Sequence, residues 1–231
     1  AQMNIPRDMW TQVIDVDLPQ VVAFERPAGG ELAVAEAAKL LSEAKFPVIL
    51  SGAGVVLSGA IPDLIALAER LDAPVCSNYQ HNDSFPGSHP LAMGPLGYNG
   101  SKAGMEIIAK ADVVLALGTR LNPFSTLPGY GIDYWPKDAK IIQVDINASR
   151  IGLTKKVTVG IQGDAGKVAR GILAQLSETA GDAGRGDRKH LVAQTKSRWA
   201  QELTSLDHED DDPGTEWNSG ARTRDADLMS P

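Results

Sequence analysis

Residues 46–60 read FPVILSGAGVVLSGA, a short apolar run followed at once by a glycine-rich turn. An apolar run of this length, bounded by turn residues, is typical of a strand buried inside a parallel sheet. A glycine-rich turn directly behind such a strand can hold phosphate on the backbone N–H groups at the start of the next helix. The stretch therefore predicts an α/β fold and raises the question of a phosphate-bearing ligand.

The chain on both sides of this stretch alternates between helical spacing and short apolar runs. Apolar residues recur at helical intervals over 34–41 and 64–71, and Ser101 and Asp164 stand where each can cap a further helix. Further apolar runs lie at 74–76, 113–117, 141–146 and 157–161. Short strands that alternate with amphipathic helices form a parallel sheet covered on both faces. We therefore expect five or six parallel strands, with helices on both faces, over residues 31–177.

The two ends of the chain differ from this middle part. Residues 2–5 have the pattern of a short strand, residues 19–30 resemble a linker, and a weak helical pattern covers 191–206. The acidic run at 207–212 is most simply a solvated linker, because such blocks repel themselves and stay open. We expect three parts of a longer protein: 1–30, the end of a preceding domain and its linker; 31–180, a central α/β domain; and 181–231, a helical and acidic linker toward a further domain.

Composition restricts the classes of partner and compartment. No apolar stretch approaches the roughly 20 residues of a membrane-spanning helix, and the amino terminus lacks the pattern of a signal peptide. The single cysteine, Cys76, excludes an internal disulfide and a zinc site made of several cysteines, and it favours a reducing cytoplasm. A net charge of −7 argues against nucleic acid as the main partner. An anionic ligand would then depend on a local cluster of arginines or backbone N–H groups.

The glycine turn departs from both common phosphate-binding motifs. A dinucleotide fingerprint needs glycine at position 57, where Leu57 stands, and an acidic residue after the second strand, where the chain reads CSNYQ. A P-loop needs lysine and Ser/Thr after Gly59, where Ala60 and Ile61 stand. Two interpretations stay open: a tight turn without a ligand, or a diphosphate resting on the backbone N–H groups of Gly52 and Gly54.

A few other polar residues follow the expected strands. His81 and Arg120 come just after two of them, where ligands of open parallel sheets gather, although a lone loop histidine is commonly only a surface residue. Asp145 ends the next strand and can cap a turn or hold a hydroxyl group. No two histidines have the spacing of metal ligands, and no Gly-x-Ser-x-Gly elbow is present. The sequence therefore offers no catalytic residue and no metal ligand.

Four motifs, taken in order, carry a resemblance to a known family. They read GAGVVLSGA, ADVVLALGTRLNPF, IIQVDINASRIG and IQGDA. In this register they resemble the Rossmann-like central domain of thiamine-diphosphate-dependent enzymes of the acetolactate synthase and pyruvate oxidase type. NIPRDMW is similar to the end of that family's first domain, and the tail ending in LMSP to the linker into its third.

The resemblance implies where the family's cofactor is held. A glutamate of the first domain activates thiamine diphosphate, and a Gly-Asp-Gly…Asn motif of the third domain holds Mg²⁺ and the diphosphate. Gly163-Asp164 and Gly186-Asp187 lack the rest of that motif, so we expect this chain to be inactive alone. SNYQHNDSFPG, GYNGSKAGM and LPGYGIDYWP are similar to members that convert the small anions sulfoacetaldehyde and phosphate to acetyl phosphate and sulfite. The resemblance also implies a homodimer or homotetramer.

Some relatives bind FAD or ADP in this central domain, and the chemistry here involves no redox step, so a flavin would be vestigial. By resemblance, the cofactor contacts would be Gly52, Gly54, Gly97, Thr119, Arg120, Asp145 and Asp164. The sequence departs from the flavin-binding pattern at Asn99 and Asn122. Alternative interpretations are a nucleotide-binding regulatory module and a purely structural spacer.

The substrates implied by the resemblance are anions, and two residues are candidates to contact them. Arg7, in the Pro6-Arg7-Asp8 turn, can offer a guanidinium fork to a sulfonate or phosphate, and His81 can lie beside the same ligand. The alternative for Arg7 is a surface ion pair with Asp8 or Asp15.

Overall fold

The computed structural model describes residues 3–209, with the side chains of 206–209 left out, and its centre is one parallel six-stranded sheet. The strand order is β3-β2-β1-β4-β5-β6, and every neighbouring pair is parallel. The strands are β1 (Pro47–Ser51), β2 (Val75–Asn78), β3 (Ala92–Leu96), β4 (Val113–Leu117), β5 (Lys140–Asp145) and β6 (Val159–Gln162). The expected sheet with helices on both faces is confirmed.

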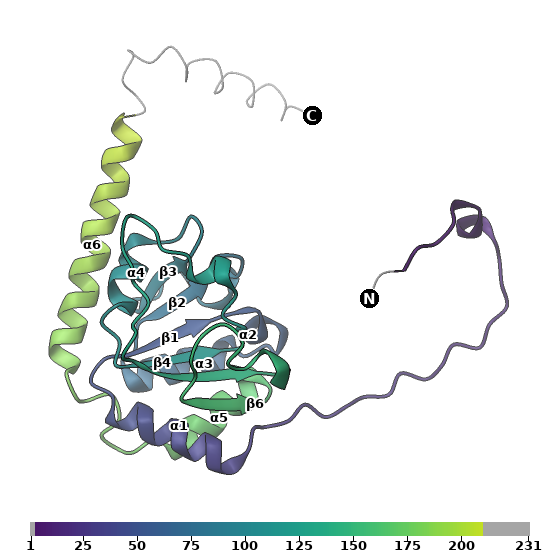
Figure 1. Ribbon diagram of the computed structural model, residues 1–231, viewed down its shortest axis with the longest axis horizontal. Helices are drawn as coiled ribbons and strands as arrows, with labels where there is room; N and C mark the ends of the chain where they lie inside the picture. The colour runs from purple at the N-terminus through teal and green to yellow at the C-terminus, as the bar shows by residue number, and fades with distance from the viewer. Residues whose placement is uncertain (1–2, 210–231) are drawn as a thin grey trace.

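Helices cover both faces of the sheet (Figure 1), and successive strand residues belong to two different apolar clusters. Ile49 and Leu115 belong to the apolar cluster under α1, α3 and α5, whereas Val48 and Val114 belong to the cluster under α4 and α6. Both faces of the central strands are therefore buried from solvent, which explains their continuous apolar runs. The helices are α1 (Glu31–Glu43), α2 (Ala53–Leu57), α3 (Ile61–Leu71), α4 (Lys102–Ile108), α5 (Ala165–Gln175) and α6 (Arg185–Glu209).

Two helix caps expected from the sequence are present. The Ser101 side chain accepts a hydrogen bond from the backbone N–H of Gly104 at the start of α4. Asp164 accepts from Gly166 and Lys167 at the start of α5. These bonds satisfy N–H groups that have no partner inside their own helix.

Helix α6 is longer than the pattern at 191–206 indicates, and it lies along the α4 side of the domain (Figure 1). Its inward stripe alternates steps of four and three residues. It consists of Arg188, Val192, Thr195, Trp199 and Glu202. Several of its contacts are polar, including an ion pair between Lys102 Nζ and Glu202 Oε1 at 2.7 Å. Because this stripe is partly polar, the apolar periodicity along the helix is weak. The sequence pattern therefore predicted a shorter helix than the structure shows.

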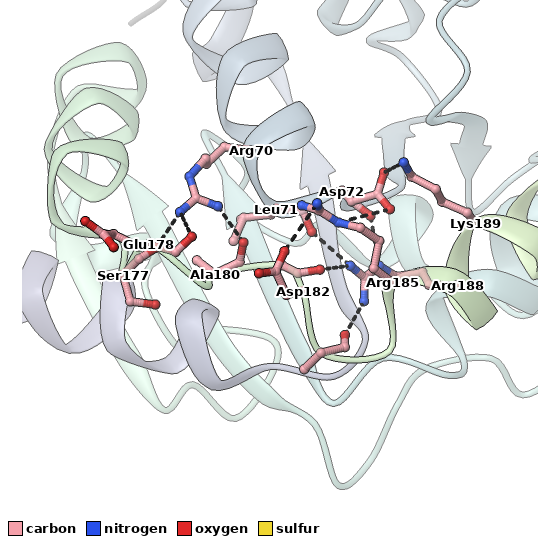
Figure 2. Close-up of polar contacts among 12 residues, drawn as sticks. Arg70, Leu71, Asp72, Ser177, Glu178, Ala180, Asp182, Arg185, Arg188 and Lys189 are labelled. Atoms are coloured by element: carbon pink, nitrogen blue, oxygen red, sulfur yellow. Dashed lines mark hydrogen bonds and ion pairs between the residues drawn. The ribbon is translucent and has the colours of Figure 1, made fainter.

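Arg188 is the main anchor of α6 and is only 1% exposed. Its guanidinium donates to five backbone carbonyls, including Lys45 O at 2.7 Å and Asp72 O at 2.9 Å (Figure 2). Burial lowers the pKa of Arg188 below its ordinary value, and the carboxylate of Asp72 opposes that shift. Beside it, Arg70 holds the carbonyls of Ser177, Glu178 and Ala180, so two arginines tie the loop before α6 to the end of α3.

The amino-terminal segment extends away from the domain (Figure 1). The strand expected at residues 2–5 is wrong for 3–5, which form no strand because no neighbouring strand pairs with them; residue 2 lies outside the described part. A 3-10 helix, η1 (Arg7–Thr11), follows, and residues 12–24 have no regular structure and are exposed. Residues 207–209 of the acidic run belong to helix α6 rather than to an open linker, whereas 210–212 and LMSP lie outside the described residues. In the part of the chain that is described, no helix is long and apolar enough to cross a membrane.

Candidate functional site

A cavity of about 410 Å³ opens at the carboxyl ends of the strands. It lies where the strand order reverses, between β1 and β4, which is where open α/β sheets bind their ligands. The turns after β1, β2, β4, β5 and β6 all contribute to its wall. The lining includes Arg26, Gly54, Asn78, His81, Thr119, Arg120, Asn122, Asp145, Arg150, Gly163 and Asp164.

The glycine turn at the floor of this cavity is required for backbone packing. A Cβ atom on Gly54 would lie 2.6 Å from the Cα of Gly118, in the turn after β4. A Cβ on Gly52 would lie 2.7 Å from the side chains of Asn78 and Thr119. Both distances are shorter than real contacts allow, so the two strand-end turns can approach each other only because these positions carry no side chain.

The backbone N–H groups of the turn are already engaged. Gly54 N donates to Gly118 O at 2.8 Å, and Gly52 N donates to Leu117 O at 3.1 Å. These two groups therefore do not point freely at a ligand, in contrast to a P-loop. An anion in the cavity would depend instead on the arginine side chains around it.

Three arginines from distant parts of the chain line the cavity. Arg26 comes from the linker before α1, Arg120 from the turn after β4, and Arg150 from the end of η4 (Ala148–Arg150). Guanidinium groups stay charged at any working pH and match the oxygens of a phosphate. Two carboxylates, Asp145 and Asp164, lie among them. The arrangement suits a ligand that carries both phosphate groups and hydrogen-bonding hydroxyls or amines.

A buried polar network supports the wall of the cavity. Asn78 Nδ2 donates to Thr119 Oγ1 at 2.9 Å, and the same oxygen accepts from Leu121 N at 3.1 Å. Gln143 Nε2 donates to the carbonyls of Thr119 and Arg150, both at 3.1 Å. These bonds fix the turns that carry Arg120 and Arg150.

Asn78 also has an unused acceptor. Its side chain lines the cavity and is 7% exposed, and its Oδ1 has no hydrogen-bond partner among the described residues. A buried amide oxygen without a partner costs about 1–3 kcal/mol, so a ligand with an N–H or O–H donor in this place would remove that cost.

The turn that carries Arg120 has an unusual backbone. Leu121 is fully buried and has φ = 52°, a left-handed conformation that costs a residue with a side chain about 1–2 kcal/mol. Thr154 Oγ1 donates to Leu121 O at 2.7 Å and helps to hold it there. The strain is a property of the loop that presents Arg120 and Asn122 to the cavity.

The two carboxylates have structural partners as well as cavity exposure. Asp145 Oδ1 accepts from Asn147 N at 2.8 Å, so it caps a turn, which is one of the two roles that the sequence left open. Asp164 caps α5 through Oδ1, and its Oδ2 accepts from Arg26 Nη1 at 3.0 Å. Each therefore has a fixed orientation at the edge of the cavity.

The structure brings most of the predicted site residues together. Gly54, Thr119, Arg120, Asp145, Asp164 and His81 all line the cavity, with Gly52 directly behind its floor. Gly97 does not line it. Gly97 is buried, has φ = +86°, and a Cβ there would collide with Phe124 O.

Arg7 lies apart from this cavity, in the exposed helix η1. Within the described residues it forms an ion pair with neither Asp8 nor Asp15. The lining residues that the sequence analysis did not name as site residues include Arg26, Asn78 and Arg150. Asn78 and Arg150 stand in CSNYQ and DINASR, directly after expected strands, and that position was the available signal.

A comparison with protein families now decides the assignment. The family described as "Thiamine pyrophosphate enzyme, central domain" matches residues 34–172. The chain belongs to the thiamine pyrophosphate enzymes. The expectation drawn from the four motifs is thereby confirmed, and every lining residue of the cavity except Arg26 lies within the matched range.

Relatives and a solved structure agree with this family. The chain is 76% identical over all 231 residues to a "Probable sulfoacetaldehyde acetyltransferase" of Rhizobium meliloti (strain 1021), covering 39% of that protein. It is 75% identical over its full length to a "Sulfoacetaldehyde acetyltransferase" of Roseovarius nubinhibens, covering 38% of that protein. The structure resembles a benzoylformate decarboxylase from Polynucleobacter necessarius, with a TM-score of 0.57 and 26% identity, over 74% of this chain and 32% of that one. The chain thus spans about two fifths of the length of the relatives named first.

Proposed function

We propose that this chain is the central-domain part of a sulfoacetaldehyde acetyltransferase. The observation that carries the proposal is 76% identity along the whole chain to a relative of that name. The reaction combines sulfoacetaldehyde with hydrogen phosphate and gives acetyl phosphate and hydrogen sulfite, with atoms and charge in balance and no external oxidant. Thiamine diphosphate, when bound, supplies the electron sink that such a carbon–sulfur cleavage needs.

The described residues do not fit the binding of thiamine diphosphate and Mg²⁺. No group of three His, Cys, Asp or Glu that could hold a metal ion occurs among residues 3–209. Asp164, in the sequence Gly163-Asp164, already caps α5 and bonds Arg26. We therefore assign both cofactors, and the catalytic residues, to parts of the longer protein outside this chain.

The cavity is proposed as an adenine-nucleotide site, for ADP or for a vestigial FAD. Its arginines would face the diphosphate, and Asp145 and the free Oδ1 of Asn78 would accept from ribose hydroxyls or an amine. His81 would lie beside the same ligand. The alternative is a structural spacer that binds nothing, and the engaged N–H groups of Gly52 and Gly54 favour at most weak binding.

The proposal also covers the compartment, the oligomeric state and the substrates of the complete enzyme. We infer a cytoplasmic homodimer or homotetramer that acts in the breakdown of sulfonates such as taurine, with sulfoacetaldehyde and phosphate as its small anionic substrates. Arg7 is assigned to the anion-binding region of the complete enzyme, because it is exposed here and without an ion-pair partner among the described residues.

The test uses the complete protein for activity. With thiamine diphosphate and Mg²⁺, sulfoacetaldehyde and phosphate should give acetyl phosphate and sulfite in equal amounts. Production of acetolactate from pyruvate, without sulfite release from sulfoacetaldehyde, would place the chain in another enzyme of the family. Loss of one charged hydrogen bond in Arg7→Ala should lower kcat/KM by about ten- to a hundredfold, and Arg7→Lys should recover part of it. Unchanged kinetics in Arg7→Ala would show that Arg7 does not contact either anion.

The 231-residue chain alone provides the nucleotide test. Isothermal titration calorimetry with ADP measures the cavity directly, and we expect weak binding that Arg120→Met weakens further. Calorimetry with thiamine diphosphate should give no binding to this chain. Micromolar affinity for thiamine diphosphate would overturn the assignment of the cofactor site to other parts of the protein.

A further inference from the structure

The linker before α1 is fastened beside the cavity, and its Arg26 belongs to the cavity lining. Arg26 Nη1 donates to Asp164 Oδ2 at 3.0 Å and to Leu57 O at 3.2 Å. Asp164 N donates to Pro27 O at 2.8 Å, and Lys167 Nζ donates to Glu25 Oε1 and Arg26 O, both at 2.8 Å. We call residues 25–29 the strap.

The strap is also held by close packing at its end. Gly29 has φ = +87°, and a Cβ there would lie 2.8 Å from Ile161 Cγ2. Gly163 approaches the same point, since a Cβ on it would lie 3.0 Å from Gly29 N. The turn that receives the strap, Gly163 to Ala165, is itself part of the cavity wall. The strap and a bound ligand would therefore both contact the turn from Gly163 to Ala165.

For residues 5–24, by contrast, no hydrogen bond or ion pair to the domain is found among the described contacts. Their large apolar side chains are exposed, with Trp10 at 74% and Phe24 at 87%. The described hydrogen bonds of this stretch are local, such as Met9 N to Pro6 O. The strap is thus the point at which the preceding segment is attached to the domain.

Arg26 has donors to spare. Its Nη1 makes both described hydrogen bonds, whereas Nε and Nη2 make none with the described residues, and its side chain is 54% exposed at the cavity mouth. A phosphate in the cavity can accept from these remaining donors while Nη1 stays on Asp164, because a guanidinium presents its N–H groups as a planar fork.

We propose that Arg26 couples occupancy of the cavity to the attachment of the strap: a phosphate-bearing ligand tightens the strap through Arg26, and the docked strap tightens the ligand. The coupling rests on the proposed nucleotide site and adds its regulation. Linkage is reciprocal, so the factor by which ADP stabilises the docked strap equals the factor by which the docked strap raises ADP affinity. Ligand binding thereby changes how firmly residues 5–24, none of which lines the cavity, are attached to the domain.

Hydrogen exchange of the 231-residue chain, with ADP as the probe, tests this coupling. Saturating ADP should slow exchange of the peptide covering residues 22–30 by about five- to 150-fold, the range that a typical coupling free energy gives. Arg26→Met should exchange faster there without ligand, should bind ADP several-fold more weakly, and should lose the response to ADP.

Two control variants isolate Arg26. Glu25→Gln removes one exposed ion pair of the strap, which contributes little, so ADP affinity and the exchange response should change far less than in Arg26→Met. Arg120→Met removes a cavity arginine that does not touch the strap. It should bind ADP more weakly, yet at saturating ADP the strap peptide should still respond.

The outcomes separate the coupling from the nucleotide site. If calorimetry detects no ADP binding, the proposed nucleotide site is wrong and the coupling is wrong with it. If ADP binds but exchange at residues 22–30 is unchanged, the site stands and the coupling is refuted. A strap in Arg26→Met that responds to ADP like the parent chain would also refute the role of Arg26.

Discussion

Replacement of Arg188 by methionine is the sharpest test of how α6 is attached. Methionine keeps much of the length and the apolar stem but removes the guanidinium that reaches five backbone carbonyls. Those carbonyls come from the end of α3, the residue Lys45 before β1, and the loop before α6. They include Leu71 O, at 3.0 Å, and Gly181 O, at 2.7 Å.

The magnitude follows from two opposing terms. Five hydrogen bonds from a charged donor, at about 1.5–3 kcal/mol each, set an upper bound of about 7–15 kcal/mol. Methionine avoids the desolvation penalty of a buried ion, which is several kcal/mol and offsets much of that bound. A net loss of about 3–5 kcal/mol remains, the usual cost of breaking a buried charged network from one side. For a domain of this size, that lowers Tm by about 6–20 °C.

The assay should separate local undocking of α6 from global unfolding. Urea unfolding followed by circular dichroism gives the global free energy, and hydrogen exchange of residues 190–205 gives the local one. Arg188→Lys keeps a charge but reaches fewer carbonyls, so an intermediate loss is expected. Lys189→Met is the matched control, because that side chain is 61% exposed and 3.9 Å from Asp72.

A loss below about 1 kcal/mol in Arg188→Met, with unchanged exchange in α6, would refute this reasoning. It would mean that water replaces the guanidinium at little cost, and that the apolar contacts of Val192 and Trp199 hold the helix. Equal losses of unfolding free energy in Arg188→Met and Lys189→Met would also contradict it. The effect would then come from removing one positive charge, not from losing the hydrogen bonds of Arg188.

Three further predictions concern single positions. Gly54→Ala should lower the free energy of unfolding by about 1–3 kcal/mol in urea titrations, because the new Cβ would lie 2.6 Å from the Gly118 backbone. Gly59→Ala is the control: its Cβ would lie in open space, and the backbone at φ = +64° alone should lower the free energy of unfolding by about 1 kcal/mol. Asp164→Ala should lose about 1–2 kcal/mol through the α5 cap, and Asp164→Asn less, in the same titration. Burial raises the pKa of Cys76 to about 12, so its thiol should resist Ellman's reagent at pH 8 until the chain unfolds. Its contribution to stability is fully present below about pH 8.5 and should fall as the pH rises toward 12.

The sheet could be predicted from sequence because its central strands are buried on both faces. β1 and β4 read as short apolar runs bounded by turn residues, and their length of five residues favours a buried strand over a buried helix. β3 was missed because Gly94 and Pro95 interrupt it. Proline lacks an N–H, and it is tolerated there because β3 is an edge strand, where that group is not needed for pairing.

The candidate site could be predicted only in part, for a geometric reason. Arg120 and Asp145 follow buried strands, and parallel strands bring their carboxyl ends to one edge of the sheet. Arg26 follows no strand. It reaches Asp164 across 138 positions of sequence, and only the path of the strap over the folded domain brings the two together. Propensity and periodicity carry no information on such a contact.

The arginine anchors explain how the proposed connecting domain could also carry the proposed ligand site. Arg26 fastens the chain where it enters, at the carboxyl edge of the sheet beside the cavity. Arg188 fastens the chain where it leaves, on Lys45 and Asp72, shortly before β1 and β2 begin, at the opposite edge. A spacer needs the Arg26 and Arg188 attachments to be rigid. A ligand in the cavity lies beside Arg26, so it can change only the Arg26 attachment. The structural and nucleotide-binding interpretations are therefore compatible, and the response of the strap to ADP, with α6 unaffected, is the observation that would distinguish a regulated spacer from a passive one.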